Sequence, residues 1–113
     1  MGFFKSLMGG GATNITPQQA RQMMDQAGDY VLLDVRTPAE FKQVRIRGAR
    51  LIPVDEILSR ALAELPDKNV PIFVYCQSGA RARSAARTLV QMGYTKVYNF
   101  GGIAGWPYET VRG

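Results

Sequence analysis

The chain contains no histidine and only one cysteine among its 113 residues. Without a second cysteine it forms no internal disulfide, and it lacks both the cysteine clusters and the imidazole groups that hold most zinc ions. A Ser-His-Asp triad and a Cys-His pair are excluded for the same reason. If the protein is an enzyme, its nucleophile, acid or base comes from another residue type, and we predict neither a metal nor a cofactor.

Long apolar runs are also absent, and none approaches the ~18 residues that a membrane span needs. The apolar part of the opening MGFFKSLMGGG is too short for a secretory signal, and no small-residue cleavage site follows it. Gly2 and Ser6 match the myristoylation pattern, and residues 3–8 would present one apolar side to a membrane or a partner. We prefer a loosely ordered tail, and so predict a flexible segment over residues 1–13 and one domain over 14–113.

The remaining composition, with 46% hydrophobic and 20% charged residues, is that of one ordinary globular domain. Lys and Arg number 14 against 9 Asp and Glu, and the resulting charge of +5 suits an anionic small substrate, a nucleic acid or an acidic membrane surface. The charges are scattered and no nucleic-acid-binding motif is present, so we predict no nucleic-acid partner. A lone free cysteine is consistent with a reducing compartment, which predicts a cytoplasmic protein.

Helix and strand signals alternate along the chain. Thr16 with Gln19 and Thr37 with Glu40 form two capping boxes, each with proline at the first helical position. Helices are expected over 17–26, from 38 onward, over 55–65 with apolar spacing through Ile57, Leu58, Leu62 and Leu65, and over 81–92; strands are expected over 30–35, 51–52, 70–75 and 97–100. Strands that are apolar on both sides and alternate with helices predict an α/β fold with a parallel sheet covered on both faces.

Ligands of such folds bind beyond the carboxyl ends of the strands, which is where Cys76 falls, directly after the apolar run 70–75. The following turn contains Gly79 and leads into a helix, so its backbone N–H groups are expected to converge on an anion. A thiolate at this position should have a depressed pKa, to which Arg81 and Arg83 would contribute. The alternative, a buried structural thiol, is the usual state of a lone cysteine, but the strand end, the glycine turn and the arginines favour a nucleophile.

Four segments, CQSGAR, LLDVRTPAEF, RIRGARLIPV and NFGGIAGW, together resemble the single-domain rhodanese (thiosulfate sulfurtransferase-like) family, and the resemblance runs from about Asn14 to Trp106. It implies a three-layer α/β fold with a central, mainly parallel sheet flanked by helices. It also implies that Cys76 takes a sulfane sulfur from thiosulfate or a similar small anionic donor, becomes a persulfide, and passes the sulfur to cyanide or to a small-molecule or protein thiol. The covalent intermediate predicts ping-pong kinetics.

The resemblance assigns a role to each residue of the loop. Cys76 is the catalytic residue, Asp34 and Arg36 support the loop or form a fold-stabilising ion pair, and the predicted substrate-binding residues are Gln77, Ser78, Gly79, Ala80, Arg81 and Ala82. Phosphatases of related fold have one residue more between the cysteine and the arginine, so the shorter loop argues against phosphate as the group handled.

Some positions depart from the family pattern or allow two interpretations. Gln77 and Ala82 stand where many members have a basic and a hydroxyl residue, which bears on donor preference and turnover. Glu40 is expected to act in its capping box alone, and Trp106 to pack in the core. The arginines at 45, 47 and 50 would form a cationic rim or a solvated loop. Besides a sulfurtransferase, the sequence allows a low-turnover binding module or a persulfide carrier for a partner protein.

Overall fold

The computed structural model describes residues 11–113, so the predictions for Gly2, Ser6 and residues 3–8 lie outside the described part of the chain. The strands are β1 (Thr13–Asn14), β2 (Val31–Asp34), β3 (Arg45–Ile46), β4 (Arg50–Leu51), β5 (Ile72–Cys76), β6 (Val97–Gly102) and β7 (Thr110–Val111). The α-helices are α2 (Pro17–Gln26), α3 (Pro38–Gln43), α4 (Ile57–Glu64) and α5 (Ala80–Gln91), and the short 3₁₀ turns are η1 (Val54–Glu56) and η2 (Ile103–Gly105).

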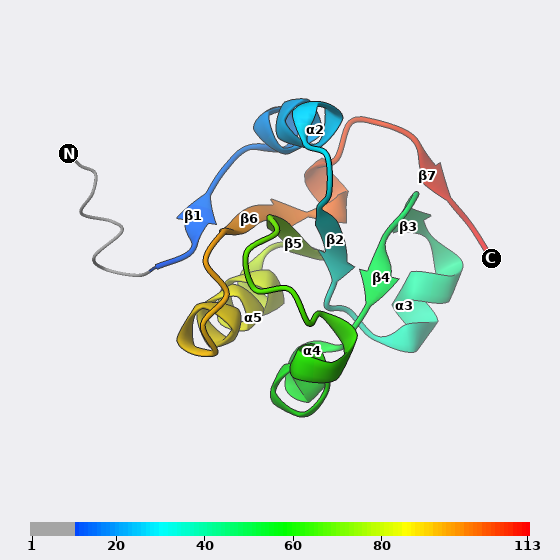
Figure 1. Ribbon diagram of the computed structural model, residues 1–113. Helices are drawn as coiled ribbons and strands as arrows, with labels where there is room; N and C mark the ends of the chain where they lie inside the picture. Colours follow the sequence, from blue (N-terminus) through cyan, green and yellow to red (C-terminus); the bar gives the residue numbers. More distant parts are fainter. Residues whose placement is uncertain (1–10) are drawn as a thin grey trace.

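Five strands form the central sheet in the order β1-β6-β5-β2-β4, and every neighbouring pair in it is parallel. This confirms the predicted parallel sheet, with β5 at its centre. A second, two-stranded sheet pairs β3 with β7 in antiparallel fashion. Figure 1 shows this smaller sheet beside α3, at the end of the molecule that also holds the carboxyl terminus.

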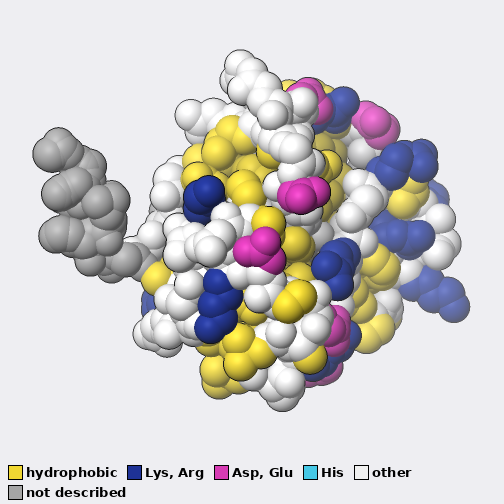
Figure 2. Space-filling model, in the orientation of Figure 1, with side chains coloured by type: hydrophobic (Ala, Val, Ile, Leu, Met, Phe, Trp, Pro, Cys, Tyr) yellow, Lys and Arg dark blue, Asp and Glu magenta, His cyan; other side chains and the backbone are white. Residues whose placement is uncertain are grey.

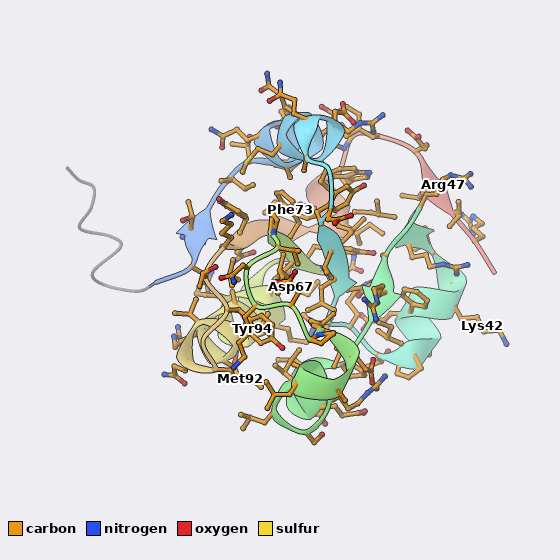
Figure 3. All side chains as sticks on the ribbon, viewed as in Figure 1. Lys42, Arg47, Asp67, Phe73, Met92 and Tyr94 are labelled. Carbon is orange, nitrogen blue, oxygen red and sulfur yellow. The ribbon has the colours of Figure 1, made fainter. Side chains whose placement is uncertain are left out.

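Helices cover both faces of the central sheet, with α2 on one side and α4 and α5 on the other (Figure 1). Side chains of β5 alternate between the two cores: Phe73 packs with residues of α2, whereas Val74 packs with residues of α4 and α5. Figure 3 shows Phe73 on the α2 side and Tyr94 near α4 and α5. The fold is therefore the three-layer α/β arrangement that the sequence predicted.

Both capping boxes form as predicted. The hydroxyl of Thr16 accepts the N–H of Gln19 while the Gln19 side chain accepts the N–H of Thr16, and Thr37 and Glu40 make the same reciprocal pair. Each box satisfies two backbone N–H groups that a helix start would leave unpaired. The boxes therefore explain why α2 and α3 begin where they do.

The helix expected over 55–65 begins two residues later than expected, at Ile57, and two of its apolar side chains point into solvent. Residues 54–56 form the 3₁₀ turn η1 before α4, and the side chains of Leu58 and Leu62 are 73% and 55% exposed. Ile57, Ala61 and Leu65 are buried instead. The apolar spacing that predicted the helix therefore does not mark its buried face, which runs through Ala61 and leaves the two leucines in solvent.

Three two-residue strands were not predicted. β3 and β7 are too short to carry a period-two pattern, and β1 is polar and lies at the edge of the sheet. The sheet begins at Thr13, which pairs with Tyr98, one residue before the expected start of the domain. Within residues 11–113, no helix has both the length and the apolar character required to cross a bilayer.

Basic side chains gather on the part of the surface formed by α3, β3 and β7. Figure 2 shows dark-blue side chains along that edge, and Figure 3 places Lys42 and Arg47 there. Lys42, Arg47 and Arg112 are exposed, while Arg45 is half-buried against the ring of Phe41. Four of the 14 basic residues of the chain thus lie at this end of the molecule.

Candidate active site

Cys76 is the last residue of β5, the central strand of the five-stranded sheet, and it is only 1% exposed. Opposite it, β6 contains an extra residue: Val74 pairs with Asn99, but Cys76 pairs with Gly102. Such a bulge bends the strand and changes the direction of the residues that follow. The bulge brings the end of β6 beside the loop that leaves Cys76.

Gly79 turns this loop back onto the thiol. Its φ of +123° is a conformation that side-chain-bearing residues rarely adopt, and its N–H donates to Cys76 Sγ at 3.0 Å. Gly79 is also the residue before α5, and no side chain caps that helix start. The N–H groups of the first turn of α5 therefore remain available to an anion held above the thiol.

Gly102 and Ala104 support the other end of the loop, a contribution that the sequence analysis did not identify. A Cβ atom on Gly102 would lie 2.1 Å from the carbonyl oxygen of Gln77, so only glycine fits there. The N–H of Ala104 donates to the same Gln77 carbonyl at 3.2 Å. The segment GGIAG thus shapes the cysteine loop, and Trp106 beyond it packs in the core as predicted. The only sequence signal for this role was the glycine pair itself.

Arg81 is held by Glu40, against the expectation that Glu40 serves its capping box alone. Arg81 Nη1 and Nη2 donate to Glu40 Oε1 and Oε2 at 2.8 and 3.0 Å. The hydrogen bond from Arg81 lowers the pKa of Glu40 from 4.5 to about 2, although partial burial acts in the opposite direction. One carboxylate therefore both caps α3 and fixes the guanidinium of the loop.

The bond to Glu40 is also the main reason that the pKa of Arg81 is raised, and the negative charges of Cys76 and Asp34 add to it. Arg81 thus lies in the electrostatic field of the thiol, as predicted. Its charge is largely balanced by Glu40. The positive potential at the thiol consequently depends on the backbone N–H groups as well as on this side chain.

Asp34 and Arg36 form a fully buried ion pair just past β2. Arg36 Nη2 donates to Asp34 Oδ2 at 2.7 Å and to the carbonyl oxygen of Val44 at 2.6 Å. Burial opposes the charge of Arg36, but the hydrogen bond and the charge of Asp34 outweigh it, so the pKa of Arg36 is raised. The pair ties the end of β2 to the start of β3, which is the fold-stabilising interpretation of these residues.

Tyr75 extends this buried network from the central strand. Its hydroxyl accepts the N–H of Ile46 at 3.1 Å, and the guanidinium of Arg36 lies 5.7 Å from the centre of its ring. Burial raises the pKa of the Tyr75 hydroxyl well above its ordinary value of 10, so it remains neutral. The residue before Cys76 therefore anchors the smaller sheet to the central one.

The structure brings the predicted loop residues together around Cys76. Gly79 and Ala82 are buried, Arg81 is half-buried, and the exposed members are Gln77, Ser78 and Ala80. The arginines of the suggested rim do not act together: Arg50 donates to the carbonyl of Glu64 and Arg45 to that of Phe41, whereas Arg47 is exposed. These contacts favour local roles over a common anion site.

Comparison with known proteins agrees with this geometry. Residues 16–108 match the family model described as Rhodanese-like domain. The thiosulfate sulfurtransferase PspE of Escherichia coli (strain K12) is 38% identical over 81 residues, covering 72% of this chain and 78% of that protein. The thiosulfate sulfurtransferase GlpE of Glaesserella parasuis is 39% identical over 95 residues, covering 83% and 85%.

A solved structure gives the same result. A rhodanese from E. coli determined with anions superposes with a TM-score of 0.71 at 36% identity, covering 75% of this chain and all of that one. The range matched by the family model, residues 16–108, includes Cys76 and the loop that follows it. From its sequence match and its fold together, the chain belongs to the family of rhodanese-like domains.

Proposed function

We propose that Cys76 is the nucleophile with which this sulfurtransferase moves a sulfane sulfur from thiosulfate to cyanide or a thiol. Two relatives that resemble most of the chain are named thiosulfate sulfurtransferases, which supports both the reaction class and the donor. The observation that carries the proposal is the N–H of Gly79, which donates to Cys76 Sγ at 3.0 Å at the uncapped start of α5. Such an environment stabilises a thiolate without a histidine.

The reaction proceeds in two displacements. In the first, the thiolate of Cys76 attacks the outer sulfur of thiosulfate, a bond forms between the two sulfurs, and the former S–S bond breaks with its electron pair leaving on sulfite. In the second, cyanide or a thiolate attacks the outer sulfur of the persulfide, and the electron pair of the breaking bond returns to Sγ. Splitting the transfer into two steps is covalent catalysis with ping-pong kinetics.

The loop supplies what each step requires. Thiosulfate is a dianion and the persulfide is largely anionic, so both need hydrogen-bond donors near Sγ. The N–H groups of the first turn of α5 are free of side-chain caps. Arg81 lies beside them, and its guanidinium is bound by the carboxylate of Glu40. These donors are fixed before substrate arrives, because Gly102 and Glu40 hold the two ends of the loop.

Mass spectrometry of the intact protein tests the proposal. After incubation with thiosulfate the protein should gain the mass of one sulfur atom, which cyanide should remove as thiocyanate. Since Cys76 is the only cysteine, the Cys76→Ala variant is the direct control and should gain nothing. A wild-type protein that forms no adduct at any thiosulfate concentration would refute the proposal.

The same measurement separates the enzyme from the two alternative functions. An enzyme discharges its persulfide to cyanide repeatedly and produces thiocyanate in large excess over protein. A carrier would load but discharge slowly to small acceptors, and a binding module would not load. We expect multiple turnovers, because the thiol, the glycine turn and the arginine of the loop are all present.

We also propose a reducing compartment, the cytoplasm, as the site of action. A reactive thiolate without a partner cysteine is readily oxidised where disulfides form. Fractionation of cells that produce the full chain tests this, and recovery from an oxidising compartment would contradict it.

A further inference from the structure

Beside the cysteine loop, two adjoining cavities form one groove between α5 and the edge strand β1. The inner cavity, of about 230 Å³, is lined by Ser78 and Gly79 of the loop. The outer cavity, of about 520 Å³, continues along α5 to Arg87. Both are lined by Asn14, Arg83 and Asn99. Because these residues line both, the two cavities adjoin, and we call the pair the α5 groove.

The α5 groove carries uncompensated positive charge. Arg83 and Arg87 are exposed and lie four positions apart on α5, so their side chains project from the same face about 6 Å apart along the helix. Among residues 11–113 neither guanidinium has a carboxylate within ion-pair distance, and residues 1–10 contain no Asp or Glu. Arg81, by contrast, is paired with Glu40. The groove therefore presents two guanidinium charges that no carboxylate of the described residues balances, which favours an anionic ligand.

Asn99 provides an independent indication of a ligand. Its side chain lines both cavities and is 7% exposed, and its Oδ1 accepts the N–H of Gly101 at 2.9 Å. Its Nδ2 donates to no group of the described residues, yet it is not sealed from solvent. Buried amides normally satisfy both of their ends. The Nδ2 of Asn99 is thus a donor without a partner among the described residues, carried by a residue that lines both cavities.

We propose that the α5 groove binds the anionic body of a small thiol that accepts sulfur from Cys76, an inference that rests on the proposed function. The groove extends from the loop along more than one turn of α5, which is longer than a compact donor such as thiosulfate needs. Its inner end is formed by Gly79, whose N–H contacts Cys76 Sγ. A thiol whose carboxylates bind the guanidinium groups of Arg83 and Arg87 would therefore have its sulfur near the persulfide.

The transfer in this complex is balanced without another reactant. The acceptor thiolate forms a bond to the outer sulfur of the persulfide, and the bond from that sulfur to Cys76 Sγ breaks. The electron pair of the broken bond returns to Sγ as a thiolate, and the outer sulfur leaves with its negative charge as the acceptor persulfide. Arg83, Arg87 and Asn99 take no part in bond making and determine only which acceptor is bound.

Two thiols that differ in charge test the proposal. The protein is loaded with thiosulfate, freed of excess donor, and discharged with mercaptosuccinate, which carries two carboxylates, or with neutral 2-mercaptoethanol. The readout is the ratio of the two second-order rate constants, each expressed per thiolate present. We expect the wild-type ratio to favour mercaptosuccinate, and the ratio to fall about threefold in Arg87→Gln and about tenfold in the double variant R83Q/R87Q.

The matched control is Arg112→Gln, which removes the same charge beyond β7, at the end of the molecule away from β1 and α5 (Figure 1). Its ratio should stay within twofold of wild type. An unchanged ratio in R83Q/R87Q would overturn the proposal, as would an equal fall in Arg112→Gln. A loading rate with thiosulfate that falls as much as the ratio would assign the groove to the donor and also overturn it. Failure of wild-type loading would instead refute the proposed function.

Discussion

Three single residues, one in the cysteine loop and two in neighbouring elements, determine the position of the hydrogen-bond donors around Cys76. Gly79 adopts a φ of +123° and places its own N–H on Sγ, while Gly102 allows the backbone of Gln77 to approach β6. Glu40 fixes the guanidinium of Arg81 from a different helix. These three residues have no chemistry of their own in the reaction, yet each sets the position of a donor.

Gly102→Ala should damage the loop directly. The added methyl group would overlap the carbonyl of Gln77, and overpacking of this kind costs about 1–3 kcal/mol of unfolding free energy. We expect urea denaturation to show this loss and the rate of persulfide formation to fall with it. Gly105→Ala is the matched control, because a Cβ there meets nothing within 4 Å. Its unfolding free energy should stay within about 0.5 kcal/mol of that of wild type.

Glu40→Gln should change how stability depends on pH. The pKa of Glu40 is about 2 in the fold against 4.5 ordinarily, so the folded state favours the carboxylate. The stabilisation is complete above pH 4.5 and is lost as pH falls toward 2. The unfolding free energy of wild type should therefore exceed that of the variant at neutral pH, and the difference should shrink between these two values. A difference that stays constant across that range would contradict the assignment.

At the scale of elements, the two capping boxes offer a comparison within one molecule. Thr16 and Thr37 make the same contacts, but only the box of Thr37 includes a residue that also binds the loop arginine. Both Thr16→Ala and Thr37→Ala should lose about 1 kcal/mol of unfolding free energy. Only Thr37→Ala should also slow the loading of Cys76 by thiosulfate, which stopped-flow or quenched mass measurements detect. Equal loading rates in the two variants would show that the cap of α3 does not influence the site.

Helix α4 gives a second test at this scale. Ile57 is buried whereas Leu58 is 73% exposed, although the two are neighbours of similar size. Ile57→Ala should cost about 2–5 kcal/mol of unfolding free energy, and Leu58→Ala should stay within about 0.5 kcal/mol. Urea denaturation of the two variants measures both values. Similar losses in both would mean that Leu58 is covered in solution.

The elements that were predictable are those with local causes. Helices α2 and α3 begin at capping boxes whose residues are three positions apart, and β5 is a continuous apolar run. The two-residue strands β3 and β7 have no such signal, because each exists only through its partner. The spacing of apolar residues predicted helix α4 but not its buried face, because Ala61 and Leu62 are adjacent and only packing against the sheet selects Ala61.

At the scale of the whole molecule, the absence of histidine has a kinetic consequence. Thiosulfate is fully ionised at neutral pH, and the chain has no imidazole to act as an acid or base in the loading step. The rate of persulfide formation, measured as a function of pH, should therefore show no transition that belongs to a histidine. A transition near pH ~6.5, the value typical of histidine, would have to be assigned to another titratable group.

The candidate site was predictable only in part, and distance along the chain explains the rest. Cys76, Gly79 and Arg81 fall within one loop after a recognisable strand, so their proximity was expected. Glu40 lies 41 positions from Arg81, and Gly102 meets Gln77 only because of the bulge in β6. Pairings of this kind depend on the tertiary fold and leave no local pattern.

Pairing between segments far apart in the sequence also has a consequence for synthesis. Thr13 pairs with Tyr98, and Arg45 pairs with Val111, so the central sheet is incomplete until β6 has left the ribosome and the smaller sheet until β7 has done so. A nascent chain that has emerged only through α5 presents the β6-facing edge of β5 unpaired and Gln77 without its neighbours from β6. Cys76 therefore gains its neighbours from β6 only after β5 and α5 have been synthesised.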